Sequence, residues 1–197
     1  QLCHDPQPGN WRLEVETWAY IPQREFTEAV EWLTDVMRCK GQEQRVSLRV
    51  TPRNELVYDY VMTPLQFARA RSQALTYEGG EFNLPLWGDF ALVGTVAAGA
   101  TSVAVDTRYT NYLEGGKAIV WQDEVHYEVV TVAELDDSGF TFAPALEQDY
   151  SGALVMPVVT ASFLQALEVV RSRTDQVKGT ARFEVVDTAV PPSISPY

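Results

Sequence analysis

The sequence is poor in the residues that build metal sites and disulfide frameworks. Its 197 residues include only two cysteines, Cys3 and Cys39, and two histidines, His4 and His126, which lie far apart along the chain. Metal sites normally use clustered His, Cys or carboxylate ligands, so we expect no metal and no other cofactor. We interpret the cysteines as free thiols of a protein made in a reducing compartment, while their pairing stays open because spacing alone does not give their separation.

Long apolar runs and catalytic motifs are also missing. No run of about 18 apolar residues is present, so no transmembrane helix is expected. The N-terminal QLCHDPQPGN is polar and contains two prolines, unlike a signal peptide. No GxSxG, P-loop or dinucleotide-binding motif occurs, and we expect no enzymatic activity. The chain begins at Gln1 and ends in the Pro-rich AVPPSISPY, which we interpret as part of a longer chain.

Basic residues are fewer than acidic residues in this sequence. Lys and Arg total 15 against 27 Asp and Glu, which gives a net charge of −12. This balance argues against general nucleic-acid binding, which needs a basic surface to replace counterions. Five arginines nevertheless fall in the central part of the chain, and they are Arg45, Arg49, Arg53, Arg69 and Arg71. They indicate either a surface on which copies of the chain dock through opposite charges, or ordinary solvated faces.

The segment from residue 45 to residue 87 has the strongest local signals. Alternating apolar residues predict a strand over 45–50, and β-branched and aromatic residues predict another over 56–61. The Thr51-Pro52-Arg53-Asn54 turn between them predicts an antiparallel hairpin. A helix over 64–76 follows.

This helix has a capping box, with Thr63 at the N-cap, Pro64 at the first helical position and Gln66 three residues after the cap. We expect its face of Leu65, Ala68, Ser72 and Leu75 to lie on the sheet. The segment ending at Trp87 then predicts an extended edge that closes a core.

The remainder of the chain predicts a mainly β protein. Residues 11–20 alternate like a strand with one wet face, and residues 26–39 fit either a helix or a strand-turn-strand. Short β-type runs separated by turns fill 92–157, which we interpret as a small β-barrel-like module. We therefore expect a β-sandwich-like main domain over 1–91 with one packed helix, a module over 92–157 inserted into it or following in tandem, and a return to the main domain with a Pro-rich segment over 158–197. Within this last part, 163–171 fits a short helix or a strand, and 180–186 predicts a strand.

Few residues are candidates for chemistry. Glu124 and Glu128 are expected on one face of a strand, together with His126, where the two carboxylates fit either a sugar-cleaving pair or a solvated strand face. The acidic DDSG at 136–139 lacks the remaining ligand positions of a calcium loop and predicts a hairpin turn. Aromatic residues are dense in the module, and they are Tyr109, Tyr112, Trp121, Tyr127 and Tyr150. They fit either a sugar-binding surface or core packing.

Three short motifs carry a resemblance to a known family. Glu43-Gln44-Arg45 precedes the first central strand, Pro52-Arg53 forms the turn, and Pro85-Leu86-Trp87 follows the helix. With the β module and VKGTARFEVVDT after it, this order resembles tail and baseplate structural proteins of tailed bacteriophages, over residues 31–188. The resemblance implies a non-enzymatic component of the virion tail, assembled in the host cytoplasm.

The resemblance also implies the partners. We expect other tail or baseplate proteins and copies of this chain in a ring or trimer, but no nucleic acid and no membrane. Arg45, Arg49, Arg53 and Trp87 are the candidate interface or structural positions. The alternatives are a module that binds a host-surface glycan through its aromatic side chains, or a cell-wall glycosidase that uses Glu124 and Glu128.

Overall fold

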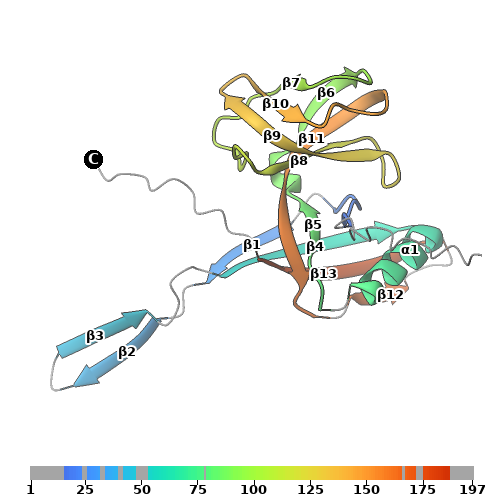
Figure 1. The fold of residues 1–197 in the computed structure, drawn as a ribbon. Coiled ribbons are helices and arrows are strands. Elements are labelled where there is room, and N and C mark those ends of the chain that lie inside the picture. Colours follow the sequence, from blue (N-terminus) through green and yellow to red (C-terminus); the bar gives the residue numbers. More distant parts are fainter. Residues whose placement is uncertain are drawn as a thin grey trace, which may run out of the picture.

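The protein is described here from a computed structural model that covers residues 16–23, 26–31, 34–39, 42–47, 53–77, 79–165, 167–171 and 175–186. These residues confirm the mainly β class with one α-helix (Figure 1). Most strands belong to a single antiparallel sheet with the order β1-β4-β13-β11-β8-β9-β10-β7, on which β5, β6 and β12 add further pairings. A second sheet contains only β2 and β3.

We name the part drawn at the bottom of Figure 1 the lower lobe. It contains α1 and the strands β1, β4, β5, β12 and β13. Their bounds are Phe26–Glu31 for β1, Arg53–Met62 for β4, Pro64–Thr76 for α1, Phe82–Pro85 for β5, Glu168–Arg171 for β12 and Val177–Val185 for β13. The β2 strand (Thr34–Cys39) and the β3 strand (Gln42–Ser47) extend from this lobe.

The upper lobe contains the strands between Ala91 and Ala143 and the first part of β11 (Figure 1). Its strands are β6 (Ala91–Val96), β7 (Ser102–Ala104), β8 (Lys117–Trp121), β9 (Tyr127–Asp136) and β10 (Gly139–Ala143). A short 3-10 helix, η1 (Trp87–Asp89), precedes it. The β9–β10 hairpin turns at Asp137 and Ser138, which confirms the hairpin predicted from DDSG.

The β11 strand (Tyr150–Phe163) is shared by both lobes. Its first part pairs with β6 and β8, and its last part pairs with β5 and β13. The chain leaves the lower lobe after β5 and returns along β11, where the Leu86 amide donates to the Pro157 carbonyl across 2.9 Å. The two chain ends of the upper lobe therefore meet side by side.

Two hydrophobic cores lie on opposite faces of β8 and β11. In β8, Ile119 and Trp121 enter the lower core, whereas Ala118 and Val120 enter the upper core. Because successive side chains of a strand point to opposite faces, one strand serves both cores. The upper core includes Val96 and Val155, and the lower core includes Trp18 and Phe183.

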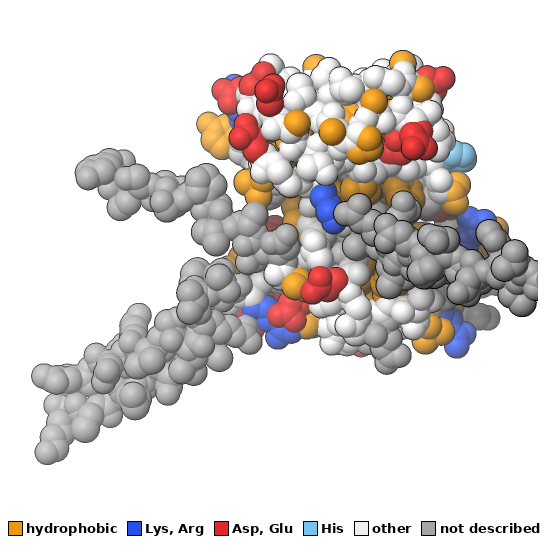
Figure 2. Space-filling view, in the orientation of Figure 1, with side chains coloured by type: hydrophobic (Ala, Val, Ile, Leu, Met, Phe, Trp, Pro, Cys, Tyr) orange, Lys and Arg blue, Asp and Glu red, His pale blue; other side chains and the backbone are white. Residues whose placement is uncertain are grey.

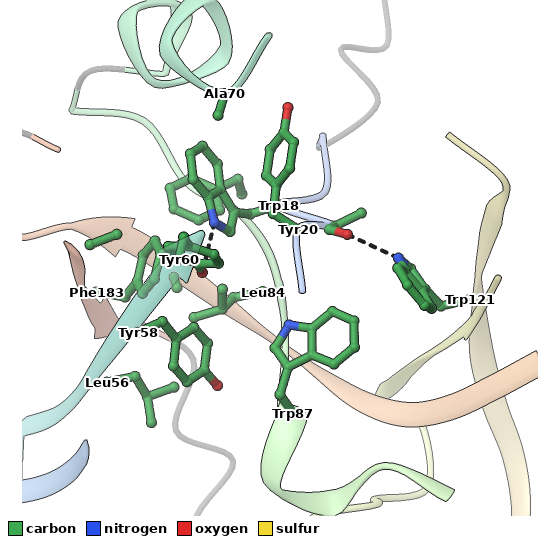
Figure 3. Close-up of a cluster of buried hydrophobic side chains, with 14 of the residues drawn as sticks. Trp18, Tyr20, Leu56, Tyr58, Tyr60, Ala70, Leu84, Trp87, Trp121 and Phe183 are labelled. Atoms are coloured by element: carbon green, nitrogen blue, oxygen red, sulfur yellow. Dashed lines mark hydrogen bonds between the residues drawn. The ribbon is translucent and has the colours of Figure 1, made fainter. Parts of the chain in front are cut away.

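Trp18 lies at the centre of the lower core, fully buried (Figure 3). Its ring makes edge contacts with Tyr20 at 4.9 Å and Phe163 at 5.1 Å between ring centroids. Its indole N–H donates to the Tyr60 hydroxyl across 2.9 Å, so the polar atoms of both buried rings are satisfied. Burial raises the pKa of Tyr60 well above its usual range.

The α1 helix begins as its sequence predicts. The Gln66 amide donates to the Thr63 hydroxyl, and the Gln66 side chain accepts from the Thr63 amide, which is a capping box with Pro64 in the first turn. The predicted buried face is wrong, however. Phe67 and Ala70 are the buried residues, while Leu65 and Leu75 are each 64% exposed. The helix packs through Phe67 and Ala70, with the partly buried Ala74 beside them, a pattern that a count of large aliphatic side chains misses.

Two strand predictions also need correction. The predicted hairpin between 45–50 and 56–61 does not form, because β3 pairs with β2, while β4 pairs with β1 and β13. The expected strand over 11–20 is described only from residue 16, and there Thr17 makes an isolated bridge to Asn83, followed by the buried Trp18, Ala19 and Tyr20. Two segments had two interpretations each. In 26–39 the described residues form the strands β1 and β2, and in 163–171 the strand β12 covers Glu168–Arg171, while Phe163 is the last residue of β11.

Candidate functional site

A two-stranded arm, defined here as β2 and β3, projects from the lower lobe (Figure 1). Thr34 pairs with Ser47 and Cys39 pairs with Gln42, so the strands run antiparallel in regular register. The arm is reached from β1 and leads back into β4, which are themselves paired. A hairpin that extends away from the body in this way presents two strand edges to its surroundings.

The β1 strand forms an open edge of the main sheet. It ends the strand order, pairs only with β4 among the described strands, and each of its six residues is exposed. Phe26 and Val30, on one face, are 38% and 53% exposed. Edge strands are usually protected by charged side chains, Pro or a bulge. The sequence FTEAVE has two glutamates but no Lys or Pro, and its register with β4 is unbroken.

The first residue of β1, Phe26, contacts η1, the short helix between the lobes. The Phe26 ring lies edge-on to Tyr58, with 5.7 Å between ring centroids, and its Cζ atom lies over Gly88 in η1. A Cβ atom at position 88 would come within 2.8 Å of that Cζ, so glycine is needed for the contact. The position of β1 is thus linked to the junction of the two lobes.

The four residues predicted as interface or structural positions have different surroundings. Arg53 pairs with Glu184 of the neighbouring β13, with 3.0 Å between Nε and Oε1. Trp87 is buried in the lower core and meets Trp121 edge-on at 5.2 Å between ring centroids. Arg45 lies in β3 opposite Val36, in the arm. Arg49 is outside the described residues, so only Arg45 is placed on a projecting element.

Glu124 and Glu128, the candidate sugar-cleaving pair, do not share a site. Glu128, in β9, accepts hydrogen bonds from the backbone amides of Glu147 and Gln148 and from the Tyr150 hydroxyl. Glu124 lies in the turn between β8 and β9 and accepts from the Gln66 side chain of α1 across 2.9 Å. One carboxylate holds a loop and the other contacts the helix, so the two do not act as a pair on one sugar.

His126 lies in the same turn rather than on a strand. Its Nδ1 is 2.7 Å from Oδ2 of Asp123, whose other oxygen accepts from the amides of Val125 and His126. Among the other aromatic candidates, Tyr112, Trp121 and Tyr150 are buried, so they cannot form a sugar-binding surface. Tyr109 is the one fully exposed ring among these candidates, and Tyr127 is half-buried at the edge of a pocket.

This pocket lies where three segments distant in sequence meet, and its volume is about 390 Å³. One side comes from residues 16–20, another from α1, and the third from the β8–β9 turn and the start of β9. The lining residues are Glu16, Thr17, Ala19, Tyr20, Arg69, Ser72, Gln73, Thr76, Glu124 and Tyr127. The Gln73 side chain donates to the Thr17 carbonyl across 2.9 Å and fixes the helix against the first segment.

Charges of both signs act on the tyrosine hydroxyls of the pocket. Burial raises the pKa of Tyr20 to about 12, while the Arg69 guanidinium opposes this rise and the Glu124 carboxylate adds to it. Burial, together with the Glu16 carboxylate, also raises the pKa of Tyr127. Both hydroxyls therefore stay protonated at neutral pH and can donate as well as accept hydrogen bonds.

Sequence reasoning missed most of this pocket. Glu16, Tyr20 and Arg69 carry no motif, and they come together only because α1 packs over the segment that follows residue 16. A local signal existed only for Glu124 and Tyr127, which lie in the aromatic and acidic part of the module. Long-range packing is what assembles the other sides.

Comparisons with protein-family models and with curated proteins found no match. Among the described residues, no group of three or more His, Cys, Asp and Glu side chains is arranged to hold a metal ion. In the same part of the chain, no helix is long and apolar enough to cross a membrane.

Proposed function

We propose that this chain is a structural component of a bacteriophage tail, at the baseplate or distal tail, which acts through protein–protein assembly. The observation that supports this function is the arm of β2 and β3, which extends beyond the end of the exposed edge strand β1 (Figure 1). Strand edges with unpaired backbone groups pair readily with a strand of another chain. The Glu43-Gln44-Arg45 and Pro85-Leu86-Trp87 motifs, which resemble tail and baseplate proteins, support the same function.

The partners would be neighbouring tail or baseplate proteins and copies of this chain in a ring or trimer. Heterologous contacts between identical subunits close into rings when the rotation between subunits allows it. In such a contact, the edge of one copy meets a different surface of the next. The exposed Phe26 and Val30 of β1 supply apolar area for this purpose.

Immunogold labelling of purified virions tests the location. An antibody to this chain should label the distal end of the tail in negative-stain micrographs. Label absent from virions, or label on the head, would overturn the proposal.

A pair of matched variants tests the edge. Val30→Lys places a charge on the open strand, and Leu75→Lys places the same charge on α1, where the leucine is similarly exposed. If β1 is an assembly edge, Val30→Lys reduces the yield of tailed particles in a complementation assay, while Leu75→Lys does not. Equal yields from both variants would show that the edge plays no part in assembly.

A further inference from the structure

The pocket between α1, residues 16–20 and the β8–β9 turn is not used by the proposed assembly function. None of its lining residues belongs to the arm. Its volume of about 390 Å³ falls in the range of about 300–1,000 Å³ that is typical of small-molecule sites.

The charged side chains of the pocket do not form ion pairs with one another. None of the ion pairs between described residues includes Arg69, Glu16 or Glu124. Glu124 is oriented by the Gln66 side chain, which donates to Oε1 and leaves Oε2 to accept from a ligand. Arg69 lines the same pocket as Glu16 and Glu124, so a hydrogen-bond donor and two acceptors border one volume.

This mixture excludes several ligand classes. Two glutamates against one arginine disfavour an anion such as phosphate. A bare cation is disfavoured by the Arg69 charge, and the described residues offer no cluster of metal ligands. A flat apolar molecule would displace water from Arg69 and Glu16 without replacing its hydrogen bonds, which is costly.

A neutral polyhydroxyl ligand satisfies every group. Each hydroxyl of a sugar both donates and accepts, so it can donate to Glu16 or Glu124 and accept from Arg69. The hydroxyls of Tyr20 and Ser72 also line the pocket, and the Thr76 hydroxyl, which donates to the Ser72 carbonyl, can still accept. Tyrosine rings in addition offer apolar surface to the C–H groups of a sugar ring.

We propose that this pocket binds a neutral saccharide unit through Arg69, Glu16 and Glu124. The site differs from a surface of exposed aromatic rings, because most aromatic residues of the module are buried. It is independent of the assembly function, and either proposal can hold without the other.

The test is a titration of the full-length, ¹⁵N-labelled protein followed by NMR. The probes are glucose, galactose, mannose, N-acetylglucosamine and N,N′-diacetylchitobiose, each raised to millimolar concentration. We expect at least one probe to cause saturable shifts of the amides of residues 16–20, 69–76 and 124–127. No saturable shift with any of the five sugars, or shifts confined to other parts of the chain, would overturn the proposal.

Matched variants separate a site from a nonspecific effect. Arg69→Ala should weaken binding about tenfold or more, because a hydrogen bond to a charged group is lost. Arg71→Ala, two residues along the same helix and outside the pocket, should bind as the parent does. Glu124→Gln is paired in the same way with Glu134→Gln of β9. Equal binding by Arg69→Ala and Arg71→Ala would contradict the proposed role of the pocket.

Discussion

The indole N–H of Trp121 donates to the backbone carbonyl of Ala19 across 2.9 Å and so joins β8 to the segment that forms one side of the pocket (Figure 3). Ala19 is buried, so this carbonyl has no access to water as a substitute. Trp87 lies edge-on to Trp121, yet its own indole nitrogen is buried without a hydrogen-bond partner among the described residues. The two tryptophans share one environment but differ in this bond.

We therefore expect Trp121→Phe to destabilise the protein more than Trp87→Phe. Both changes remove similar volume from the lower core, but only the first leaves a buried carbonyl unsatisfied, which costs about 1–3 kcal/mol. Urea denaturation of both variants measures the difference. Equal losses in the free energy of unfolding would mean that the Trp121–Ala19 hydrogen bond contributes nothing.

Glu128 gives a second prediction, because it holds the loop before β11. Glu128→Ala removes the acceptor for the amides of Glu147 and Gln148 and for the Tyr150 hydroxyl. We expect a loss of about 1–3 kcal/mol in the free energy of unfolding, measured by urea denaturation. Glu134→Ala on the same strand is the control and should change stability by less than about 0.5 kcal/mol.

Gly88 gives a third prediction. A methyl group there would meet the Phe26 ring at 2.8 Å, so Gly88→Ala must displace the ring from the base of β1. Forced repacking of this kind typically costs about 1–3 kcal/mol, and thermal unfolding measures it. Gly80→Ala is the control, because the nearest atom to its Cβ would lie at 3.6 Å.

A double variant checks the cause of that loss. In a Phe26→Ala background the ring is absent, so Gly88→Ala should cost less than it does alone. Strictly additive losses would show that Gly88 acts through something other than Phe26.

The alkaline limit of stability gives a fourth prediction. Tyr20 has a pKa of about 12 in the folded protein and about 10 in the unfolded chain. Between these values the unfolded chain releases the proton and the folded protein keeps it, so stability is full below pH about 10 and falls as pH rises toward about 12.

Tyr20→Phe removes this contribution. The free energy of unfolding of the variant should fall less steeply over the same pH interval, as measured by urea denaturation at each pH. A slope identical to that of the parent protein would mean that Tyr20 does not stay protonated there.

Local signals in the sequence were enough for several elements. Thr63, Pro64 and Gln66 fixed the start of α1, because a capping box uses only residues within one turn. The strands β8, β9 and β10 were found from alternation and the turns between them. These features depend on neighbours in sequence, so no knowledge of the fold was needed.

Strand pairing and side-chain burial depend on residues that are distant in the sequence, so local patterns predict them less well. Alternation identified β4 as a strand but could not show that it pairs with β13, more than one hundred residues later. The turn at Pro52-Arg53 favoured a partner close in sequence, which was the wrong one. Likewise, Leu65 and Leu75 looked like core residues, but the sheet beneath α1 has room for Phe67 and Ala70.

The candidate pocket shows the same limit. Glu124 was noticed because it is close to Glu128 in sequence, yet its partner is Gln66, 58 residues away. Arg69 was noted only as one of several central arginines. No pattern within a single segment indicated that both would face Tyr20.

The continuity of β11 also determines how the molecule bears a mechanical load. A force applied to the upper lobe is carried into the lower lobe along a 14-residue strand that is hydrogen-bonded to both. To separate the lobes, that strand would have to shear past its neighbours, breaking many hydrogen bonds together instead of stretching a loose connection. The connection between the lobes is therefore a hydrogen-bonded strand, and a force between them acts along its backbone.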